Sequence, residues 1–205
     1  KMEEAQLSEK VRWLKNNFFS LTAVVVIVLL FLLVLKKWNV GKQNKEKQAS
    51  LIYSEILSSS NDKTKNTETL KADYSGTPYA ALATLLLAKD NINSNEIEKA
   101  ILQLKWVIDN NNDEGIQHLA QQRLARVYLS QNNIESAEAL IKGVKANGFA
   151  SGYNEIRGDI NLAKKFPVQA KENYRLALSS LVQGDPRYDI IKMKLDDLTQ
   201  ASNVK

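Results

Sequence analysis

The chain has 205 residues, with 28 basic and 23 acidic side chains that give a net charge of +5, one histidine and no cysteine. Disulfides, thiol catalysis and cysteine metal sites are therefore excluded, and the redox state of the compartment stays open. Residues 48–205 carry nineteen basic and nineteen acidic residues. This balance argues against a DNA- or RNA-binding domain, which needs a basic footprint on its folded part.

Residues 18–35, FFSLTAVVVIVLLFLLVL, contain no charge. As a helix with a rise of about 1.5 Å per residue they would cover about 27 Å, close to the thickness of a bilayer core. Aromatic and basic residues of the kind found at membrane interfaces flank them. These interface residues are Trp13, Lys36, Lys37 and Trp38. No small-residue cleavage pattern follows, so we predict a single transmembrane helix over 18–38 rather than a signal peptide or a buried core helix.

Basic residues stand on both sides of this predicted span, four before it and five after it. The positive-inside rule therefore leaves the orientation open. Residues 36–47 carry most of the net positive charge, which suits contact with anionic lipid headgroups.

After the span the sequence predicts helices and no alternating strand, so the fold class is all-α. Residues 42–57 place Leu51, Ile52, Ile56 and Leu57 on one helical face. The polar stretch 58–69 predicts a loop that leads into another short helix. Pro78 stands at a first-turn position, where its missing N–H costs nothing, and opens a new helix. We assign 39–78 to a juxtamembrane helix and connecting loop.

Residues 79–205 contain a repeat. Residues 124–141, LARVYLSQNNIESAEALI, match earlier residues at a shift of 37 and later residues at a shift of 33. Small residues recur at two fixed places, Ala88, Ala125 and Gly158 in one and Ala100, Ala137 and Ala170 in the other, with the larger Leu104, Ile141 and Tyr174 beside them. This pattern predicts about three tetratricopeptide repeats, in which small residues let paired helices approach closely. A helix over 185–198 is expected to cap the stack.

The middle repeat fits the tetratricopeptide consensus well, since Tyr128 stands between Ala125 and Ala137. The flanking repeats are degenerate, with Asn91 and Asn161 in the place of the tyrosine. Five further stretches are YAALATLLLA (79–88), AILQLKWVID (100–109), HLAQQRLARVYL (118–129), GFASGYNEIRGDINLA (148–163) and MKLDDL (193–198). These stretches resemble the YfgM-like family, the ancillary subunit of the bacterial Sec translocon.

The resemblance implies a short cytoplasmic tail (1–17), an inner-membrane anchor and a repeat domain in the periplasm. It also implies partnership with the SecYEG channel and with a membrane-anchored periplasmic chaperone of the prolyl-isomerase class. On this reading the protein is an adaptor that assists polypeptides leaving the channel. The alternative is a structural scaffold subunit of another envelope assembly, such as a pilus or secretion apparatus.

In a tetratricopeptide stack the inner surface comes largely from the first helix of each repeat. The corresponding positions are Leu85, Lys89, Ile92, Gln122, Arg126, Leu129, Glu155, Asp159 and Leu162. Lys89 and Arg126 stand at equivalent sites, so we expect a basic strip that gives way to Asp159. Such a mixed surface would suit a peptide or a partner helix, although an ordinary solvated face is the competing interpretation.

No residue pattern indicates catalysis, a cofactor or a small-molecule substrate, and we predict a protein that is not an enzyme. The single histidine, His118, is expected to be solvated or to cap a helix. The Arg157-Gly158-Asp159 tripeptide lies in a predicted helix and is interpreted as accidental. The adjacent carboxylates Asp113 and Glu114 are expected at a solvated helix end.

Overall fold

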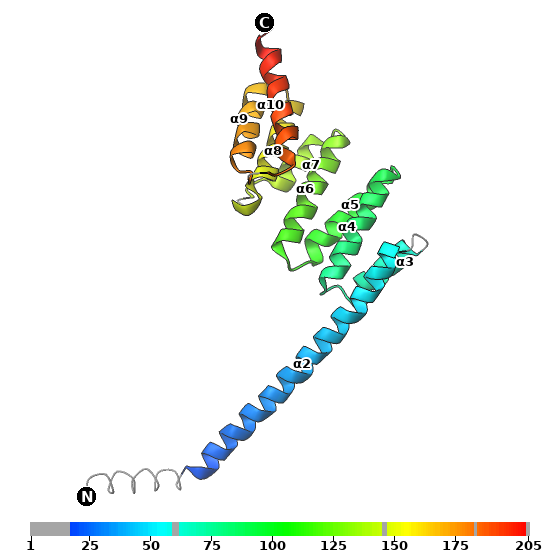
Figure 1. Cartoon of the computed structure of the whole chain (residues 1–205), viewed down its shortest axis with the longest axis vertical. Helices are drawn as coiled ribbons and strands as arrows, with labels where there is room; N and C mark the ends of the chain where they lie inside the picture. Colours follow the sequence, from blue (N-terminus) through cyan, green and yellow to red (C-terminus); the bar gives the residue numbers. More distant parts are fainter. Residues whose placement is uncertain (1–16, 59–61, 145–146, 183, 204–205) are drawn as a thin grey trace, which may run out of the picture. The chain divides into compact units, whose positions relative to one another are not determined.

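The computed structural model describes residues 17–58, 62–144, 147–182 and 184–203, and every regular element in these ranges is helical (Figure 1). This confirms the predicted all-α class. The chain divides into two units, Lys1–Gln48 and Ala49–Lys205, which we describe separately.

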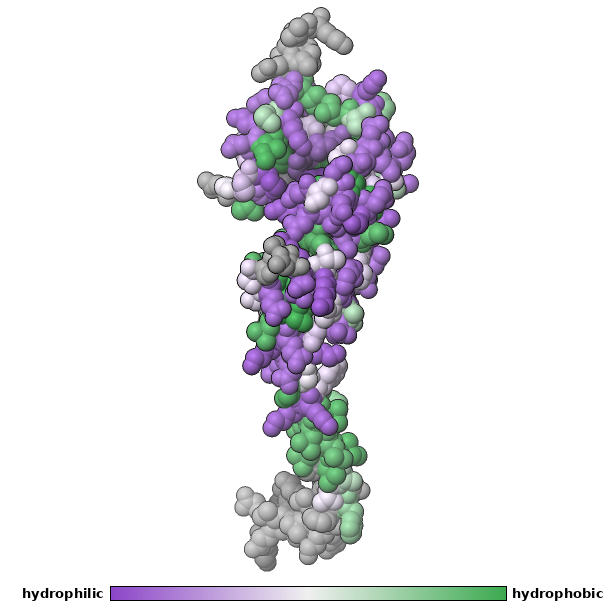
Figure 2. All heavy atoms as spheres, turned by 90° about the vertical axis from the view of Figure 1, so that its right-hand side faces the viewer, coloured by the Kyte–Doolittle hydropathy of each residue, from purple (hydrophilic) through white to green (hydrophobic). Residues whose placement is uncertain are grey.

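The first unit contains most of helix α2 (Phe18–Ser58). Its residues from Val26 to Val34 are all at least half exposed, and Figure 2 shows apolar side chains gathered around this part of the helix. The hydroxyl of Thr22 donates to the carbonyl of Phe19 at 2.9 Å, so this polar group is satisfied within the helix. A helix this long and apolar, with none of its hydrophobic window buried, has the length and composition to cross a membrane, as predicted.

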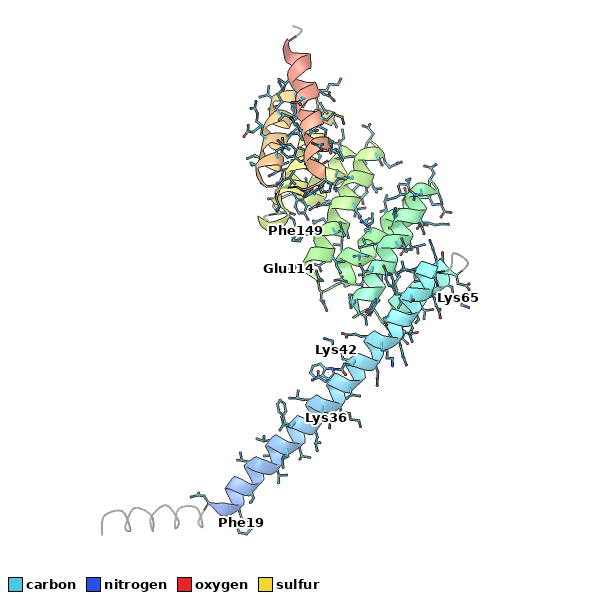
Figure 3. The ribbon with its side chains drawn as sticks, viewed as in Figure 1. Phe19, Lys36, Lys42, Lys65, Glu114 and Phe149 are labelled. Atoms are coloured by element: carbon cyan, nitrogen blue, oxygen red, sulfur yellow. The ribbon has the colours of Figure 1, made fainter. Side chains whose placement is uncertain are left out.

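The basic residues that follow the apolar stretch belong to the same helix. Lys36, Lys37 and Trp38 are exposed, and Figure 3 shows Lys36 and Lys42 projecting from α2. The separate helix expected from residue 42 is thus part of one element, because lysine and glutamine are good helix formers and no proline intervenes. Trp13 and nearly all of the predicted 1–17 tail lie outside the described residues.

The second unit begins with the last turns of α2, which pack against α3 (Lys63–Asp73) and α4 (Pro78–Asn93) through a buried apolar cluster. The cluster contains Ala49, Ile56, Leu70, Ala80 and Ala83. The predicted 58–69 loop is wrong from Lys63 onward. Although the segment is polar, its helix buries Thr67 and Leu70, and the tertiary contact overrides the weak periodicity.

Three helical hairpins follow in order (Figure 1). They are α4 with α5 (Ile97–Asn110), α6 (Glu114–Ser130) with α7 (Ile134–Ile141), and α8 (Ala150–Ala163) with α9 (Pro167–Ser179). The short 3-10 helix η1 (Asn147–Phe149) precedes α8, and α10 (Arg187–Asn203) packs against α9 at the end of the stack. These are the three predicted repeats and the predicted capping helix.

The small residues lie where the repeat predicts them, between the paired helices. Ala88, Ala125, Ala100, Ala137 and Ala170 are at most 1% exposed. Gly158 is also buried, and a Cβ atom built on it would lie 2.3 Å from Cε1 of Tyr174. Helices α8 and α9 therefore approach so closely that only glycine fits beneath the Tyr174 ring.

The turn inside each hairpin has the same backbone geometry. One residue in each turn has a positive φ, with Asn95 at 59°, Asn132 at 57° and Lys165 at 63°. The next amide returns to a carbonyl five residues earlier, as in Glu96 N to Asn91 O at 2.7 Å. The equivalent bonds are Asn133 N to Tyr128 O at 2.9 Å and Phe166 N to Asn161 O at 2.8 Å. Asn91 and Asn161, which stand in the place of the consensus tyrosine, thus close the turn through their main-chain carbonyls, as Tyr128 does.

Candidate functional site

The nine groove residues predicted from the sequence lie on the first helices of the hairpins, α4, α6 and α8. They do not form one uniform surface. Four of them line an open hollow, two others belong to a network of charges that one of the four also joins, and the remaining three lie elsewhere.

The hollow lies between the first two repeats and has a volume of about 390 Å³. Predicted residues Leu85, Lys89, Ile92 and Arg126 line it together with Arg123, which the sequence analysis missed. The other lining residues are Ala88, Leu104, Val127 and Ser130. The lining is therefore aliphatic, with three cationic side chains and no carboxylate, and we call it the basic hollow.

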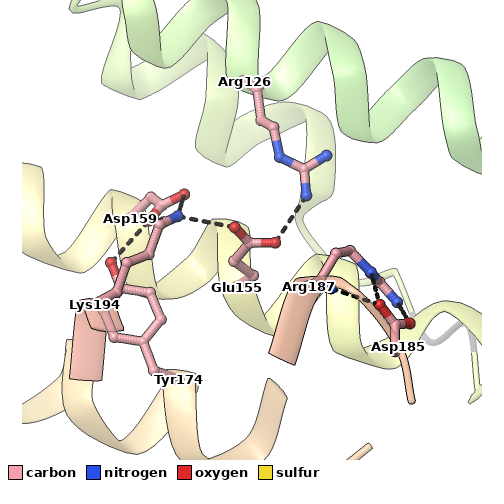
Figure 4. A network of polar contacts seen from close by, with 7 residues as sticks. All are labelled: Arg126, Glu155, Asp159, Tyr174, Asp185, Arg187 and Lys194. Carbon is pink, nitrogen blue, oxygen red and sulfur yellow. Dashed lines mark hydrogen bonds and ion pairs between the residues drawn. The ribbon is translucent and has the colours of Figure 1, made fainter. Parts of the chain in front are cut away.

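A network of charges lies beside it, on the third repeat (Figure 4). Glu155 accepts hydrogen bonds from Arg126 Nη2 at 3.0 Å and from Lys194 Nζ at 2.8 Å. Lys194 also donates to both carboxylate oxygens of Asp159, at 2.8 and 3.0 Å, and Tyr174 Oη donates to Asp159 Oδ1 at 2.7 Å. We call Arg126, Glu155, Asp159, Tyr174 and Lys194 the Glu155 network. It links α6, α8, α9 and α10.

The network explains why the acidic end of the expected groove is not free. The side chain of Glu155 is only 8% exposed, and Lys194 reaches both carboxylates from the capping helix. Arg126 is shared, since it lines the basic hollow and pairs with Glu155. The capping helix thus neutralises the acidic end, whereas the basic end stays open.

The charges shift the titration of the groups they surround. Burial alone would raise the pKa of Glu155, but the hydrogen bond from Lys194 and the charges of Arg126 and Lys194 outweigh it, so the pKa is lowered from 4.5. Burial would lower the pKa of Lys194, yet its bonds to Asp159 and Glu155 raise it. The pKa of Tyr174 is raised strongly, by burial first and then by the negative charge of Asp159, which accepts the hydrogen bond of the hydroxyl. All three shifts favour the protonation states that the network uses at neutral pH.

The lowered pKa of Glu155 predicts acid sensitivity. The unfolded chain binds a proton on this group at higher pH than the folded chain does, so the stabilisation is present above about pH 4.5 and is lost as the pH falls through the folded value. We expect Glu155→Gln to be less stable than the wild type at pH 7 and to lose less stability on acidification. Urea unfolding across this pH range measures the difference.

The matched control for this prediction is Glu98→Gln, which changes an exposed glutamate on α5. It is expected to keep the acid dependence of the wild type. An unchanged acid dependence in Glu155→Gln would contradict the assigned role of Glu155.

The last three predicted residues have other surroundings. Gln122 is buried against α8, since a Cβ atom on Gly152 would lie 2.2 Å from its Oε1. Leu129 is partly buried against the core between the second and third hairpins. Leu162 is 44% exposed on α8.

Two other residues considered from the sequence, His118 and Asp113, form hydrogen bonds within the repeat domain. His118 is not simply solvated, as had been expected, because its Nδ1 lies 2.7 Å from Tyr153 Oη, and that hydroxyl donates to Gln121 Oε1 at 2.7 Å. Burial raises the pKa of Tyr153 to about 12.

Asp113 caps α6 by accepting a hydrogen bond from the Ile116 amide at 3.1 Å, which confirms a helix-end role. In the part of the chain that the structure describes, no group of three or more histidine, aspartate or glutamate side chains could hold a metal ion.

The hairpin stack and the apolar helix define a tetratricopeptide-repeat protein with a helix that is long and apolar enough to cross a membrane. Residues 11–200 match a family model described as a tetratricopeptide repeat-like domain. The chain is 31% identical over 164 residues to an ancillary SecYEG translocon subunit of Neisseria gonorrhoeae, covering 77% of this chain and 78% of the relative. It is 26% identical over 201 residues to the protein of the same name from Escherichia coli, covering 96% and 97%.

The chain therefore belongs to the YfgM-like family of ancillary SecYEG translocon subunits, as the sequence motifs indicated. The match to the Escherichia coli relative extends over the apolar helix as well as the repeats, since it spans nearly the whole of both chains. No solved structure matches the chain.

Proposed function

We propose that the protein is a non-enzymatic adaptor of the bacterial inner membrane that associates with the SecYEG translocon. Its anchor would hold the repeat domain in the periplasm, beside polypeptides that leave the channel. There the repeats would recruit a membrane-anchored chaperone of the prolyl-isomerase class. The observation that carries the proposal is the end-to-end match to relatives that are named as translocon subunits. Tethering raises the local concentration of the partners, so weak contacts with the repeats suffice.

Co-purification of the full chain from membranes in mild detergent, followed by mass spectrometry, tests the partners. SecYEG subunits and a periplasmic chaperone are expected. A large stable complex without translocon subunits would contradict the proposal and would favour a scaffold of another envelope assembly.

The absence of cysteine makes the orientation directly measurable, because one introduced cysteine is the only thiol in the chain. We expect Asp109→Cys, on the exposed surface of α5, to react with a membrane-impermeant maleimide once the outer membrane is opened. Gln6→Cys, in the N-terminal tail, should react only after the inner membrane is broken. The reverse pattern would place the repeats in the cytoplasm and would overturn the proposed topology.

A further inference from the structure

The basic hollow combines an aliphatic floor with a rim that carries charges of one sign. Its floor is aliphatic, since Leu85 and Val127 are buried there. Ile92 lies at the edge and is 37% exposed. Its rim carries Lys89, Arg123 and Arg126, and no carboxylate belongs to the lining. Because residues 48–205 carry equal numbers of basic and acidic side chains, this single-sign rim is a local feature of the hollow.

The rim cations are not equivalent. Arg126 is paired with Glu155 at 3.0 Å. Lys89 and Arg123, both exposed, form no ion pair with any residue that the structure describes. Burial first, and then the neighbouring positive charge of Arg126, lower the pKa of Arg123. An anion beside Arg123 would favour its charged form.

Of the three rim cations, only Arg126 has an acidic partner among the residues that the structure describes, and that partner is Glu155. Lys194 pairs with both acidic residues of α8, Glu155 and Asp159. The capping helix therefore closes the acidic end of the inner surface and leaves a hollow that is complementary to negative charge.

We propose that the basic hollow is the docking site for an acidic, aliphatic segment of a partner polypeptide. A leucine-sized side chain would rest on Leu85, Ile92 and Val127, and an aspartate or glutamate carboxylate would lie between Lys89 and Arg123. A hollow of about 390 Å³ is large enough for such side chains, and its aliphatic floor distinguishes the ligand from a purely anionic one. The inference deepens the proposed adaptor function by assigning a chemistry to the segment that the repeats hold.

The test uses the full chain in lipid nanodiscs and fluorescence anisotropy. The probe is a short fluorescein-labelled peptide that presents leucine and aspartate between serine spacers. In the control peptide asparagine replaces aspartate. We expect the aspartate peptide to bind more tightly, and its affinity to fall with added salt, because exposed ion pairs are screened.

Variants of the chain test whether the aspartate peptide binds at the basic hollow. Each exposed ion pair contributes up to about 1 kcal/mol, so Lys89→Glu combined with Arg123→Glu is expected to raise the Kd for the aspartate peptide by about tenfold or more. Ile92→Ser, which removes an aliphatic contact, should raise it by about fivefold. The matched control, Lys105→Glu with Lys192→Glu, reverses two exposed lysines on α5 and α10 and should leave the Kd unchanged.

Equal affinity for the two peptides, equal effects of the two double variants, or binding of anionic lipid vesicles in place of the peptide would each overturn this proposal. Co-purification of SecYEG is scored separately. If the peptide fails to bind while SecYEG co-purifies, the docking proposal is overturned and the adaptor function stands. If the peptide binds as expected while SecYEG is absent, the adaptor function fails and the docking site stands.

Discussion

Replacing Gly158 with valine is expected to lower the free energy of unfolding of the repeat domain by about 3 kcal/mol, the upper part of the usual range for overpacking a core. A Cβ atom at this position would lie 2.3 Å from Cε1 and 2.5 Å from Cδ1 of Tyr174. The ring has no free space, because Tyr174 is fully buried and its hydroxyl is held by Asp159. Helices α8 and α9 would have to separate. Urea unfolding of the full chain in mild detergent, followed by circular dichroism, measures the loss.

Two further variants show whether the clash is the cause. Gly76→Val places the same side chain in open space, where a Cβ atom meets nothing within 4 Å, and should change the free energy by less than about 0.5 kcal/mol. Tyr174→Leu is expected to destabilise the domain by itself, but it removes the ring that a Cβ atom at position 158 would meet. Combined with Gly158→Val, it should cost less than the sum of the two single changes. Strict additivity would show that the ring contact does not account for the loss.

The second large effect is expected at Lys194. Lys194→Met keeps most of the side-chain volume but removes the ammonium that Glu155 and Asp159 share. Removing one partner of a buried ion pair costs about 3–5 kcal/mol. We expect about 2 kcal/mol here, since Lys194 is 28% exposed and water can reach part of the network. Urea unfolding measures the loss, and amide hydrogen exchange should show faster opening of α10 than of α4.

Lys192→Met is the control for Lys194→Met. It makes the same change on the same helix at an exposed residue and should stay within about 0.5 kcal/mol of the wild type. Equal losses in the two variants would mean that the effect comes from helix α10 in general and not from the Glu155 network.

The packing of the hairpins could be predicted because it depends on residue size at a fixed spacing. Ala88, Ala125 and Gly158 lie between paired helices as the repeat requires, and Tyr174 is fully buried beside Gly158. The same reasoning placed Lys89 and Arg126 on one surface, and both residues line the basic hollow.

The role of Lys194 could not be predicted from the sequence. Its partners Glu155 and Asp159 precede it by 39 and 35 residues, and the contact depends on how α10 docks after a segment without repeat character. His118 was misjudged for the same reason, because Tyr153 lies 35 residues further on. Charged and polar side chains can form hydrogen bonds with water or with another side chain, and the local sequence does not distinguish the two outcomes.

The hairpin turns bear on how far such repeats can diverge. Their closing hydrogen bonds join main-chain atoms, namely the amides of Glu96, Asn133 and Phe166 and the carbonyls five residues earlier. Every residue type supplies the carbonyl, so side chains in these turns can drift without changing the angle between the paired helices. The residue with positive φ recurs after 37 and then 33 residues, and the difference lies outside the turns. It comes from the lengths of the helices and of the connections between them, since α5 and α6 have 14 and 17 residues whereas α7 and α8 have 8 and 14. Mutation can therefore change the side chains in a turn and the lengths of the helices beside it while the backbone geometry of the turn is kept.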